Sequence, residues 1–479
     1  MNGIDPESPI PIYYQLKTMI LEDIVGGTYQ PGDRLPTEHE LCARHGISRT
    51  PAHRALTELA NEGVILRARR RGTFVNPHWA PRGSSGDDLR LLVTDARWAE
   101  QIREGAPPRL AVSTAAVGFA DMRATLTSAV AEGRAPDLAL IDEVWIADFA
   151  EAGFLLPIDE LDPDWVEREY NTDFVAAFVD GHSYNNHVYA IPEEINVGGL
   201  WCRRDALRNV GADVPTTWDE LTEVAARLQS RQRPNDQAFA IPGGHVAGET
   251  TTYCLLAVLG SNGASLIDGG VTLDSGSAVS ALRFLRSLVE QGLMTADVVT
   301  YNWTRCPQLL GAGRVAMTVG GSYEAELIAT SAGIPLEDIP AHFAFSPFPG
   351  GPSGAPATIA GGMAYAVFRQ SSDPAKALRL LEHIVTTERL VERARGRAAI
   401  PPRQSAIELA ASESPYVQQV AELFPTAVVR PRIPDYHMVS TQLQNMLESV
   451  LTGRYGPATA VERTAEITAA ITGLPIRHS

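Results

Sequence analysis

The sequence is poor in cysteine, and its four cysteines stand far apart. Cys42, Cys202, Cys254 and Cys306 form no CxxC pair and show no metal-ligand spacing. This scattering argues against a disulfide scaffold and a zinc centre, and it predicts buried, reduced thiols in a cytoplasmic protein. We therefore expect neither a metal nor a cofactor.

Long apolar segments are also missing. No run of about 18 apolar residues occurs, so we expect no membrane-spanning helix. The first residues, MNGIDPESPIPIYY, lack the basic and apolar regions of a secretory signal. Both absences again predict a cytoplasmic protein.

Catalytic signatures are absent as well. The sequence contains no HExxH, no phosphate loop ending in GK[ST] and no GxSxG elbow. His245 and Glu249 stand four residues apart, but the glycines around them disfavour the helix that a metal pair would need. Asp142 and Glu143 have no identifiable carboxylate opposite them, so glycoside hydrolysis is unsupported. We predict that the protein is not an enzyme.

Charge is distributed unevenly along the 479 residues, a length that predicts two or three domains. The net charge is -17, yet residues 1–80 hold nine Lys/Arg and nine Asp/Glu. Within 44–71, seven arginines face only two glutamates. Positive charge is therefore concentrated in one small unit, as binding to DNA phosphates requires.

That unit has the pattern of three short helices. Ile12, Leu16, Ile20 and Ile24 recur every four residues, which predicts an amphipathic first helix. Thr37 and Glu40 form a capping-box pattern for a second helix that runs to about residue 45. Gly46 then provides a tight corner, and Ser48 is placed to cap a third helix.

The third helix and the segment after it have features of a DNA reader. Arg49, Thr50, His53 and Arg54 crowd the outer N-terminal end of the helix, where a recognition helix meets base edges. Apolar alternation over 64–75 surrounds the tip Arg-Arg-Arg-Gly, which predicts a basic hairpin. The alternative is that these arginines form an ordinary solvated surface.

Residues 10–76 resemble the winged helix-turn-helix of GntR-type bacterial transcription regulators. The matching text is PGDRLPTEHEL, GISRTPAHRAL, LANEGVI and RGTFV. The resemblance implies an α+β domain over 8–77 that binds double-stranded operator DNA. The residues expected at the DNA are Arg34, Thr37, His39, Ser48, Arg49, Thr50, His53, Arg54, Arg71, Gly72 and Thr73. His39 and His53 stand where many relatives have arginine, so the operator sequence cannot be transferred from the family.

A second domain follows a linker over 78–88 that is rich in Pro, Gly and Ser. Buried strands are predicted at 89–95 and 137–144, and amphipathic helices at 217–229, 277–293 and 373–385. This alternation favours an α/β fold around parallel sheets.

Residues 88–475 resemble the solute-binding proteins of bacterial ABC sugar importers. The resemblance is carried in order by DLALIDEVWIADFAEAGFLLPIDEL, VYAIPEEINVGGLWCRRDAL, LLGAGRVAMTVGGSYEA, ATIAGGMAYAVF and AAIPPRQSAI. It implies a two-lobed α/β periplasmic-binding-protein-like fold over 89–479. Lobe one would comprise about 89–193 and 363–402, and lobe two about 194–362 and 403–479.

The resemblance also implies a ligand cleft between those lobes. The residues expected there are Asp95, Trp98, Asp142, Glu143, Trp145, Glu194, Glu249, Thr250, Tyr253, Trp303, Tyr323, Gly362, Met363 and Arg403. Carboxylates and aromatic faces suit a sugar or oligosaccharide, although an acidic lining suits an amine-bearing ligand equally. Alternatives remain open: the first two carboxylates could be a solvated loop, Glu194 a hinge ion pair, Trp145 core and Arg403 a structural clamp.

Together these features predict a multidomain, ligand-responsive transcription regulator that binds DNA as a homodimer. A small solute, with a carbohydrate as the first candidate, would act through closure of the lobes. The alternative is a cytosolic carbohydrate receptor whose basic domain docks a protein partner.

Overall fold

The computed structural model describes residues 4, 11–25, 28–30, 32–61, 64–68, 72–76, 88–107, 110–231, 236–395 and 397–477. The predicted linker over 78–88 lies outside these residues, apart from Asp88. The chain divides into two compact units, one formed by 1–141 and 367–383 and the other by 142–366 and 384–479. Among the described residues, none of the helices combines the length and apolar character that crossing a bilayer requires.

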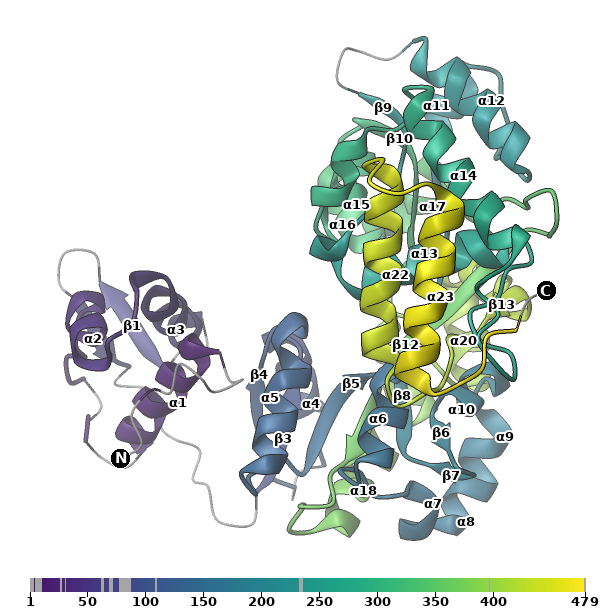
Figure 1. Ribbon diagram of the computed structural model, residues 1–479. Helices are drawn as coiled ribbons and strands as arrows, with labels where there is room; N and C mark the ends of the chain where they lie inside the picture. Colours follow the sequence, from purple (N-terminus) through teal and green to yellow (C-terminus); the bar gives the residue numbers. More distant parts are fainter. Residues whose placement is uncertain are drawn as a thin grey trace. The chain divides into compact units, whose positions relative to one another are not determined.

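The N-terminal part of the first unit has three helices followed by a hairpin. They are α1 (Ile12–Val25), α2 (Glu38–His45), α3 (Arg49–Asn61), β1 (Ile65–Ala68) and β2 (Gly72–Val75) (Figure 1). The predicted helices and hairpin are therefore confirmed. Leu16, Ile20 and Ile24 are buried together with Leu56 and Leu59 of α3. The apolar face of α1, with its spacing of four residues, therefore packs on the third helix.

The rest of the first unit is an α/β arrangement. It contains β3 (Leu89–Val93), α4 (Ala96–Gly105), β4 (Val112–Ala116), α5 (Phe119–Ala131), β5 (Leu138–Asp142) and α18 (Pro374–Ile384). The strands lie in the order β4-β3-β5 and are parallel. Both strands and the helix that the sequence predicted here are present.

The second unit has its own strands around one long central strand, β8 (Ala190–Arg203). The order is β12-β8-β10-β9, with β11 also paired to β8 and β13 to β12. The other strands are β6 (Ser183–Tyr184), β7 (His187–Val188), β9 (Gln237–Ala240), β10 (Val315–Gly321), β11 (Phe343–Ser346), β12 (Thr358–Val367) and β13 (Ala427–Val428).

The prediction of parallel sheets was wrong for this unit. β8 is antiparallel to β10, β11 and β12, whereas β10 and β9 are parallel. The reason lies in the chain path, because β8 and β12 come from two segments that are far apart in the sequence and run in opposite directions. Two segments that run in opposite directions can pair only as antiparallel strands.

The remaining helices belong to this unit. They are α6 (Ile146–Glu151), α7 (Ile158–Leu161), α8 (Pro163–Trp165), α9 (Asn171–Asp173), α10 (Ala176–Gly181), α11 (Arg204–Asn209), α12 (Trp218–Gln229), α13 (Glu249–Gly260), α14 (Gly276–Glu290), α15 (Arg305–Gly311), α16 (Ala325–Ala332), α17 (Ile339–His342), α19 (Thr387–Ala394), α20 (Gln404–Glu413), α21 (Pro415–Ala421), α22 (Tyr436–Leu451) and α23 (Pro457–Thr472). α12 and α14 confirm the two remaining predicted amphipathic helices.

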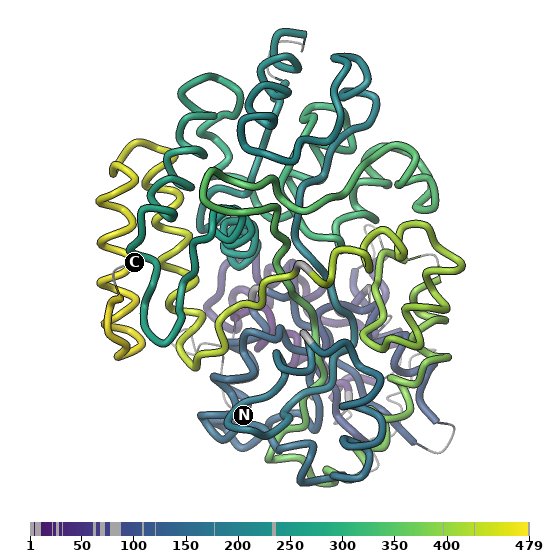
Figure 2. Tube along the Cα trace, turned by 90° about the vertical axis from the view of Figure 1, so that its right-hand side faces the viewer, coloured from purple at the N-terminus to yellow at the C-terminus, as the bar shows by residue number. Residues whose placement is uncertain are grey.

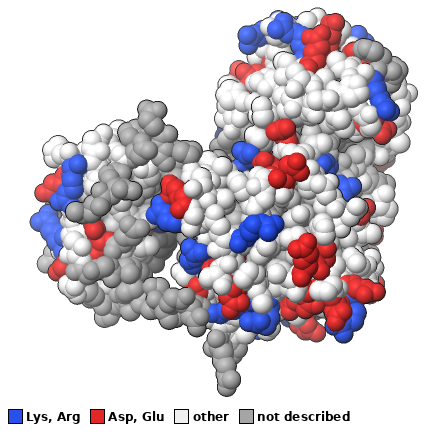
Figure 3. Space-filling model, turned by 60° about the horizontal axis from the view of Figure 1, so that its bottom comes forward, with Lys and Arg blue, Asp and Glu red and all other residues white. Residues whose placement is uncertain are grey.

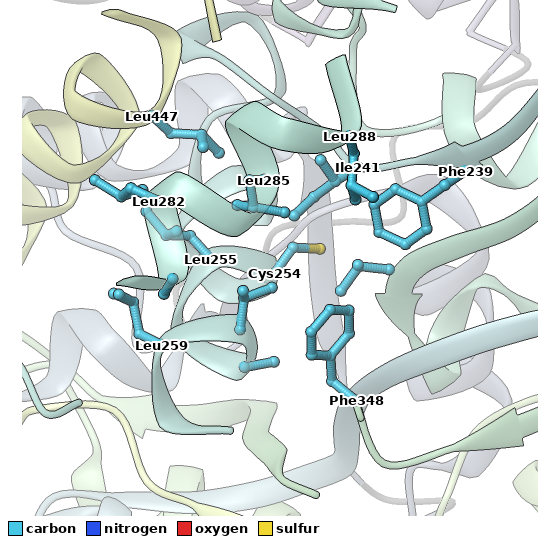
Figure 4. Close-up of a cluster of buried hydrophobic side chains, with 14 of the residues drawn as sticks. Phe239, Ile241, Cys254, Leu255, Leu259, Leu282, Leu285, Leu288, Phe348 and Leu447 are labelled. Atoms are coloured by element: carbon cyan, nitrogen blue, oxygen red, sulfur yellow. The ribbon is translucent and has the colours of Figure 1, made fainter. Parts of the chain in front are cut away.

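The main core of the second unit lies between α13, α14, α22 and the strands. Leu255 and Leu259 of α13 meet Leu282 and Leu285 of α14, and Leu447 of α22 closes the cluster (Figure 4). The C-terminal helices α22 and α23 run beside this part of the chain in both views (Figures 1 and 2). The core therefore packs α13 against α22, the two helices that contribute to the candidate ligand site.

Candidate DNA-binding and ligand-binding sites

The turn between α2 and α3 is built by local capping. Thr37 Oγ1 accepts a hydrogen bond from the Glu40 backbone N–H, and the Glu40 carboxylate accepts one from the Thr37 N–H, so the predicted capping box is present. Gly46 has φ 66° and ends α2 in the left-handed conformation that glycine adopts without strain. The chain can therefore turn at once into the third helix.

Most of the predicted DNA-contacting side chains are exposed. Arg34, His39, Ser48, Arg49, Thr50, His53 and Arg54 are exposed, whereas Thr37, Gly72 and Thr73 are half-buried. Arg71 lies outside the described residues. Charged side chains of both signs are interspersed on the surface shown in Figure 3. The described candidates are thus accessible, and their contact with DNA remains a prediction.

The hairpin explains why a glycine stands at position 72. Gly72 has φ +119°, and a Cβ atom there would lie 2.9 Å from Nε of Arg34. The segment before α2 also runs along β2, because the Leu35 N–H donates to the Thr73 carbonyl. Arg34 is therefore packed against the hairpin, beside Gly72 and Phe74.

Two of the predicted DNA-contacting residues share a partner that the sequence analysis missed. Arg49 Nε lies 3.2 Å from Oε2 of Glu38, and His53 Nδ1 lies 2.8 Å from Oε1. Arg67, on strand β1, donates to the same Oε1 atom. Burial raises the pKa of Glu38, but the hydrogen bonds from His53, Arg49 and Arg67 outweigh burial and lower it. Glu38 is therefore the anion around which these cations gather.

Arg54 is also anchored within the domain. Its guanidinium lies 3.6 Å from the ring centroid of Tyr13, and its Nε lies 3.2 Å from Oε1 of Glu58. These contacts combine a cation–π interaction with an i,i+4 ion pair. Arg54 is thus held against helix α1, and it would have to keep or exchange these partners on DNA.

The candidate ligand site begins where strand β5 ends. Leu138–Asp142 is buried throughout, and a short 3-10 turn over Glu143–Trp145 follows it. Asp142 Oδ1 accepts from the Val144 N–H at 3.2 Å and so caps the turn. Two adjacent carboxylates, Asp142 and Glu143, are thereby buried at a strand end.

Arg430 joins three of the predicted ligand residues. Its Nη2 lies 3.1 Å from Asp142 Oδ1 and 3.0 Å from Glu143 Oε1, and its Nη1 lies 2.9 Å from Glu249 Oε1. Its guanidinium also faces the ring of Tyr253 at 5.4 Å. Four residues that the sequence analysis named separately therefore converge on one arginine that it did not name.

Glu249 is held from a second direction by helix α22. Tyr436 Oη donates to Glu249 Oε1 at 2.9 Å, and Ser440 Oγ donates to Oε2 at 2.5 Å. Gly248, whose φ is +59°, is the N-cap of α13 and directly precedes Glu249, the first residue of that helix. The glutamate is thus oriented by both the helix start and α22.

Tyr253 completes this cluster on the strand side. Its hydroxyl lies 2.8 Å from Asn196 Oδ1 on β8 and 3.0 Å from the Ile359 carbonyl on β12. Its ring lies 6.4 Å from that of Tyr323, another predicted ligand residue. We define the Arg430 cluster as Arg430, Asp142, Glu143, Glu249 and Tyr253.

The electrostatics of the Arg430 cluster are uneven. Burial raises the pKa of Glu143, and Arg430 only partly opposes that rise. The same balance raises the pKa of Glu249. One guanidinium contacts three carboxylates, so the contacts within the cluster leave negative charge in excess. Such a group can accept hydrogen bonds or attract a cation.

A pocket opens beside the cluster. Its lining residues are Glu143, Val144, Ala147, Gly181, Ser183, Val429, Arg430, Pro431 and Arg432. Glu143 and Arg430 therefore reach the pocket wall. Carboxylate and guanidinium groups at one wall offer hydrogen-bond acceptors and donors to a molecule of about the size of water.

The remaining predicted ligand residues are spread more widely. Trp145 is buried near Phe149, which supports its reading as core, while Trp303 is 49% exposed. Glu194 and Met363 pair across β8 and β12, beside Gly362, where a Cβ atom would lie 2.5 Å from the Glu194 carbonyl oxygen. Thr250 hydrogen-bonds to Tyr323, next to the cluster.

Arg403 has the structural role that the sequence left open. Its Nη1 lies 2.9 Å from Glu169 and 3.2 Å from Asp173, and its guanidinium faces the Phe174 ring at 4.7 Å. These contacts describe a clamp. The expected ligand contact by Arg403 remains a prediction.

Asp95 and Trp98 belong to the first unit. Asp95 Oδ1 accepts from the backbone N–H groups of Arg97 and Trp98, so it is the N-cap of α4, and Trp98 is 5% exposed. Their expected ligand contacts remain predictions.

Sequence reasoning missed Arg430, Tyr436 and Ser440, which complete the ligand-side cluster. One signal existed: Arg430 follows the apolar run Ala-Val-Val, and a buried arginine requires an anionic partner. The identity of that partner depends on long-range packing, since Arg430 is 288 residues away from Asp142.

Comparison with known proteins agrees with the two-part organisation. Residues 12–75 match the model of bacterial regulatory proteins of the gntR family, and residues 108–388 match that of bacterial extracellular solute-binding proteins. The predicted resemblances and fold class are thus confirmed. Both matches are to regulatory or binding families rather than to catalytic ones.

Individual relatives match one part each. The HTH-type transcriptional repressor NagR of Bacillus subtilis is 45% identical over 74 residues, which are 15% of this chain and 30% of the repressor. An ABC transporter solute-binding protein of Thermotoga lettingae, solved with alpha-D-tagatose, has a TM-score of 0.72 at 24% identity, covering 81% of this chain and 100% of that one. Maltose-bound MalE3 of T. maritima has a TM-score of 0.70 at 23% identity, covering 79% and 98%. At these identities the two structures show a shared fold.

Proposed function

The chain belongs to the family of bacterial extracellular solute-binding proteins and carries a GntR-type DNA-binding domain, and on this premise we propose that it is a ligand-responsive transcription regulator. The observation that carries the proposal is the presence of both modules in one polypeptide. A solute-binding fold joined to a DNA reader couples the occupancy of one site to the affinity of the other.

The DNA-binding step uses the exposed face of α3 together with the hairpin. A homodimer in the cytoplasm would place two recognition helices on an inverted repeat, with half-sites about 34 Å or a multiple of it apart. Arg49, Thr50 and His53 are exposed at the start of α3, which supports base contacts from this helix.

The ligand in this proposal is a small hydroxylated solute, with a carbohydrate as the first candidate. The Arg430 cluster supports it, because the carboxylates accept hydrogen bonds from hydroxyl groups while Arg430 offsets part of their charge. The Thermotoga lettingae and T. maritima structures named above hold alpha-D-tagatose and maltose. Both are polyhydroxylated ligands of the kind proposed here.

An amine-bearing ligand is the second candidate, and a specific observation favours it. Three carboxylates contact a single guanidinium, and a ligand ammonium group would supply part of the missing positive charge. The two candidates differ in salt dependence, because binding of a charged amine weakens with ionic strength more than binding of a neutral sugar.

Ligand binding is proposed to act through closure of two lobes, comprising about 89–193 with 363–402, and 194–362 with 403–479. A ligand can shift this equilibrium only by its difference in affinity for the open and closed states. DNA affinity then changes by the same coupling free energy, which is typically about 1–3 kcal/mol.

The proposal is tested with the full chain in two steps. A thermal-shift screen of neutral sugars and amino sugars identifies ligands, since a ligand that binds the folded state raises its melting temperature. Fluorescence anisotropy with duplexes selected from a random library then measures DNA affinity with and without that ligand. Selection of no duplex, or a DNA affinity indifferent to every stabilising ligand, would reject ligand-responsive regulation.

A further inference from the structure

Glu38 connects three parts of the candidate DNA interface. It is the first residue of α2, and it contacts Arg49 and His53 on α3 and Arg67 on β1. Its carboxylate is divided between them, because Oε2 receives Arg49 while Oε1 receives the other two. A single anion therefore ties the recognition helix to the hairpin.

The exposures within this cluster differ strongly. The side chain of Glu38 is 16% exposed, whereas those of Arg49 and His53 are 86% and 60% exposed. The anion is thus set back in the domain, and the cations stand in front of it. This is the arrangement of a support for outward-facing groups rather than of a group that itself touches DNA.

The connection to the hairpin is doubled through Thr57. Arg67 Nη1 donates to Thr57 Oγ1 at 2.9 Å, while Thr57 Oγ1 itself donates to the His53 carbonyl at 2.8 Å. Residues 49, 53 and 57 share one face of α3, since they are spaced by four. The cluster therefore fixes the rotation of that face relative to strand β1.

We propose that Glu38 is a positioning residue that sets the sequence specificity of the DNA interface. This inference rests on the proposed DNA-binding function. Glu38 orients Arg49 and His53 for contact with base edges, and its negative charge opposes loose binding of the same cations to phosphates. A repulsive element of this kind favours one partner over others even when it lowers total attraction.

The substitution Glu38→Gln separates these effects from ordinary stability. Removal of the charge frees the cations for phosphates, so we expect several-fold tighter binding to a scrambled duplex and a salt slope steeper by about one. Loss of the oriented contact should lower the ratio of specific to scrambled affinity by about tenfold. A merely structural residue would weaken binding to both duplexes alike.

Glu40→Gln is the matched control. It removes the same charge from the same turn of α2, and glutamine preserves the capping box with Thr37. We expect it to leave the ratio of specific to scrambled affinity unchanged. Glu38→Asp keeps the charge but shortens its reach, so it should retain weak scrambled binding while losing specificity.

The experiment uses the full chain and duplexes that the wild-type protein selects from a random library, with anisotropy measured at several salt concentrations. Thermal melts check that each variant is folded at the assay temperature. If Glu38→Gln is not folded, Glu38→Asp serves as the test. Unchanged specificity in the folded Glu38 variants, with a wild-type protein that does select a duplex, would overturn the role of Glu38 alone. Failure of the wild-type protein to select any duplex would overturn the proposed function and this inference with it.

Discussion

Arg430→Met is expected to destabilise the solute-binding part severely. Arg430 is 5% exposed and offsets part of the negative charge of three carboxylates at 2.9–3.1 Å. Methionine occupies a similar length but leaves Asp142, Glu143 and Glu249 without their shared cation. Removal of one partner from a buried ion pair costs about 3–5 kcal/mol, a large share of the 5–15 kcal/mol by which domains are usually stable.

The pH dependence of this loss has a definite sign. Burial already raises the pKa of Glu143 and Glu249 in the folded protein, and removal of Arg430 removes the charge that opposes the rise. A carboxyl group with a raised folded-state pKa binds protons more tightly when folded than when unfolded. Such a carboxyl group therefore lowers the free energy of unfolding most at neutral pH. The loss of stability caused by Arg430→Met should shrink as the pH falls from about 7 to 5.

Urea unfolding followed by tryptophan fluorescence measures the effect. Six of the seven tryptophans follow residue 88, so the signal reports on the solute-binding part. Arg208→Met is the control, because Arg208 is exposed and its substitution should cost no more than about 0.5 kcal/mol. A variant of Arg430 as stable as the wild type at pH 7, or one whose deficit grows towards pH 5, would refute the reasoning.

Three further predictions use other parts of the molecule. Arg49→Ala should abolish specific DNA binding and leave ligand affinity unchanged. Anisotropy measures the DNA affinity and calorimetry the ligand affinity. Intact DNA binding would count against α3 as the recognition helix. Glu194→Ala should weaken binding of the sugar found by thermal shift without altering DNA affinity in its absence, and calorimetry that detects no loss rejects the ligand-site map. His182 is fully buried, and burial lowers its pKa from 6.5 to about 4, so the folded state loses stability as the pH falls through that window, by up to about 3 kcal/mol. His182→Gln should flatten this acid sensitivity in thermal melts, whereas His187→Gln should not, because a hydrogen bond to Asp159 raises the pKa of His187 instead.

The DNA-binding domain could be predicted closely because its signals are local. Thr37 and Glu40, which are three positions apart in the sequence, cap the start of α2. Gly46 supplies the left-handed corner directly after this helix. Each of these features is decided by neighbours in the sequence. The position of Glu38 beneath Arg49 and His53 escaped prediction, because it requires α2 and α3 to be packed first.

The candidate ligand site was predictable only in half. Asp142, Glu143 and Glu249 each follow a strand or begin a helix, so their type and place suggest polar contacts. Their common partner Arg430 lies in a loop before α22, and no periodicity links it to them. The mixed sheet was missed for a related reason. Strand direction depends on the path of the chain between distant segments such as β8 and β12, and local alternation of strands and helices does not reveal that path.

The Glu38 and Arg430 clusters, which have central charges of opposite sign, show the same limit of prediction from sequence. At Glu38 one half-buried anion contacts several cations, and at Arg430 one buried cation contacts several carboxylates. In both cases the sequence analysis identified the several charges of one sign but not the single counter-ion that they share. Burial makes that counter-ion decisive, because an unpaired buried charge costs more than the surface pairs contribute. A site residue recognised by its charge therefore implies a second residue of opposite charge, and substitution of that second residue is the more sensitive test of the site.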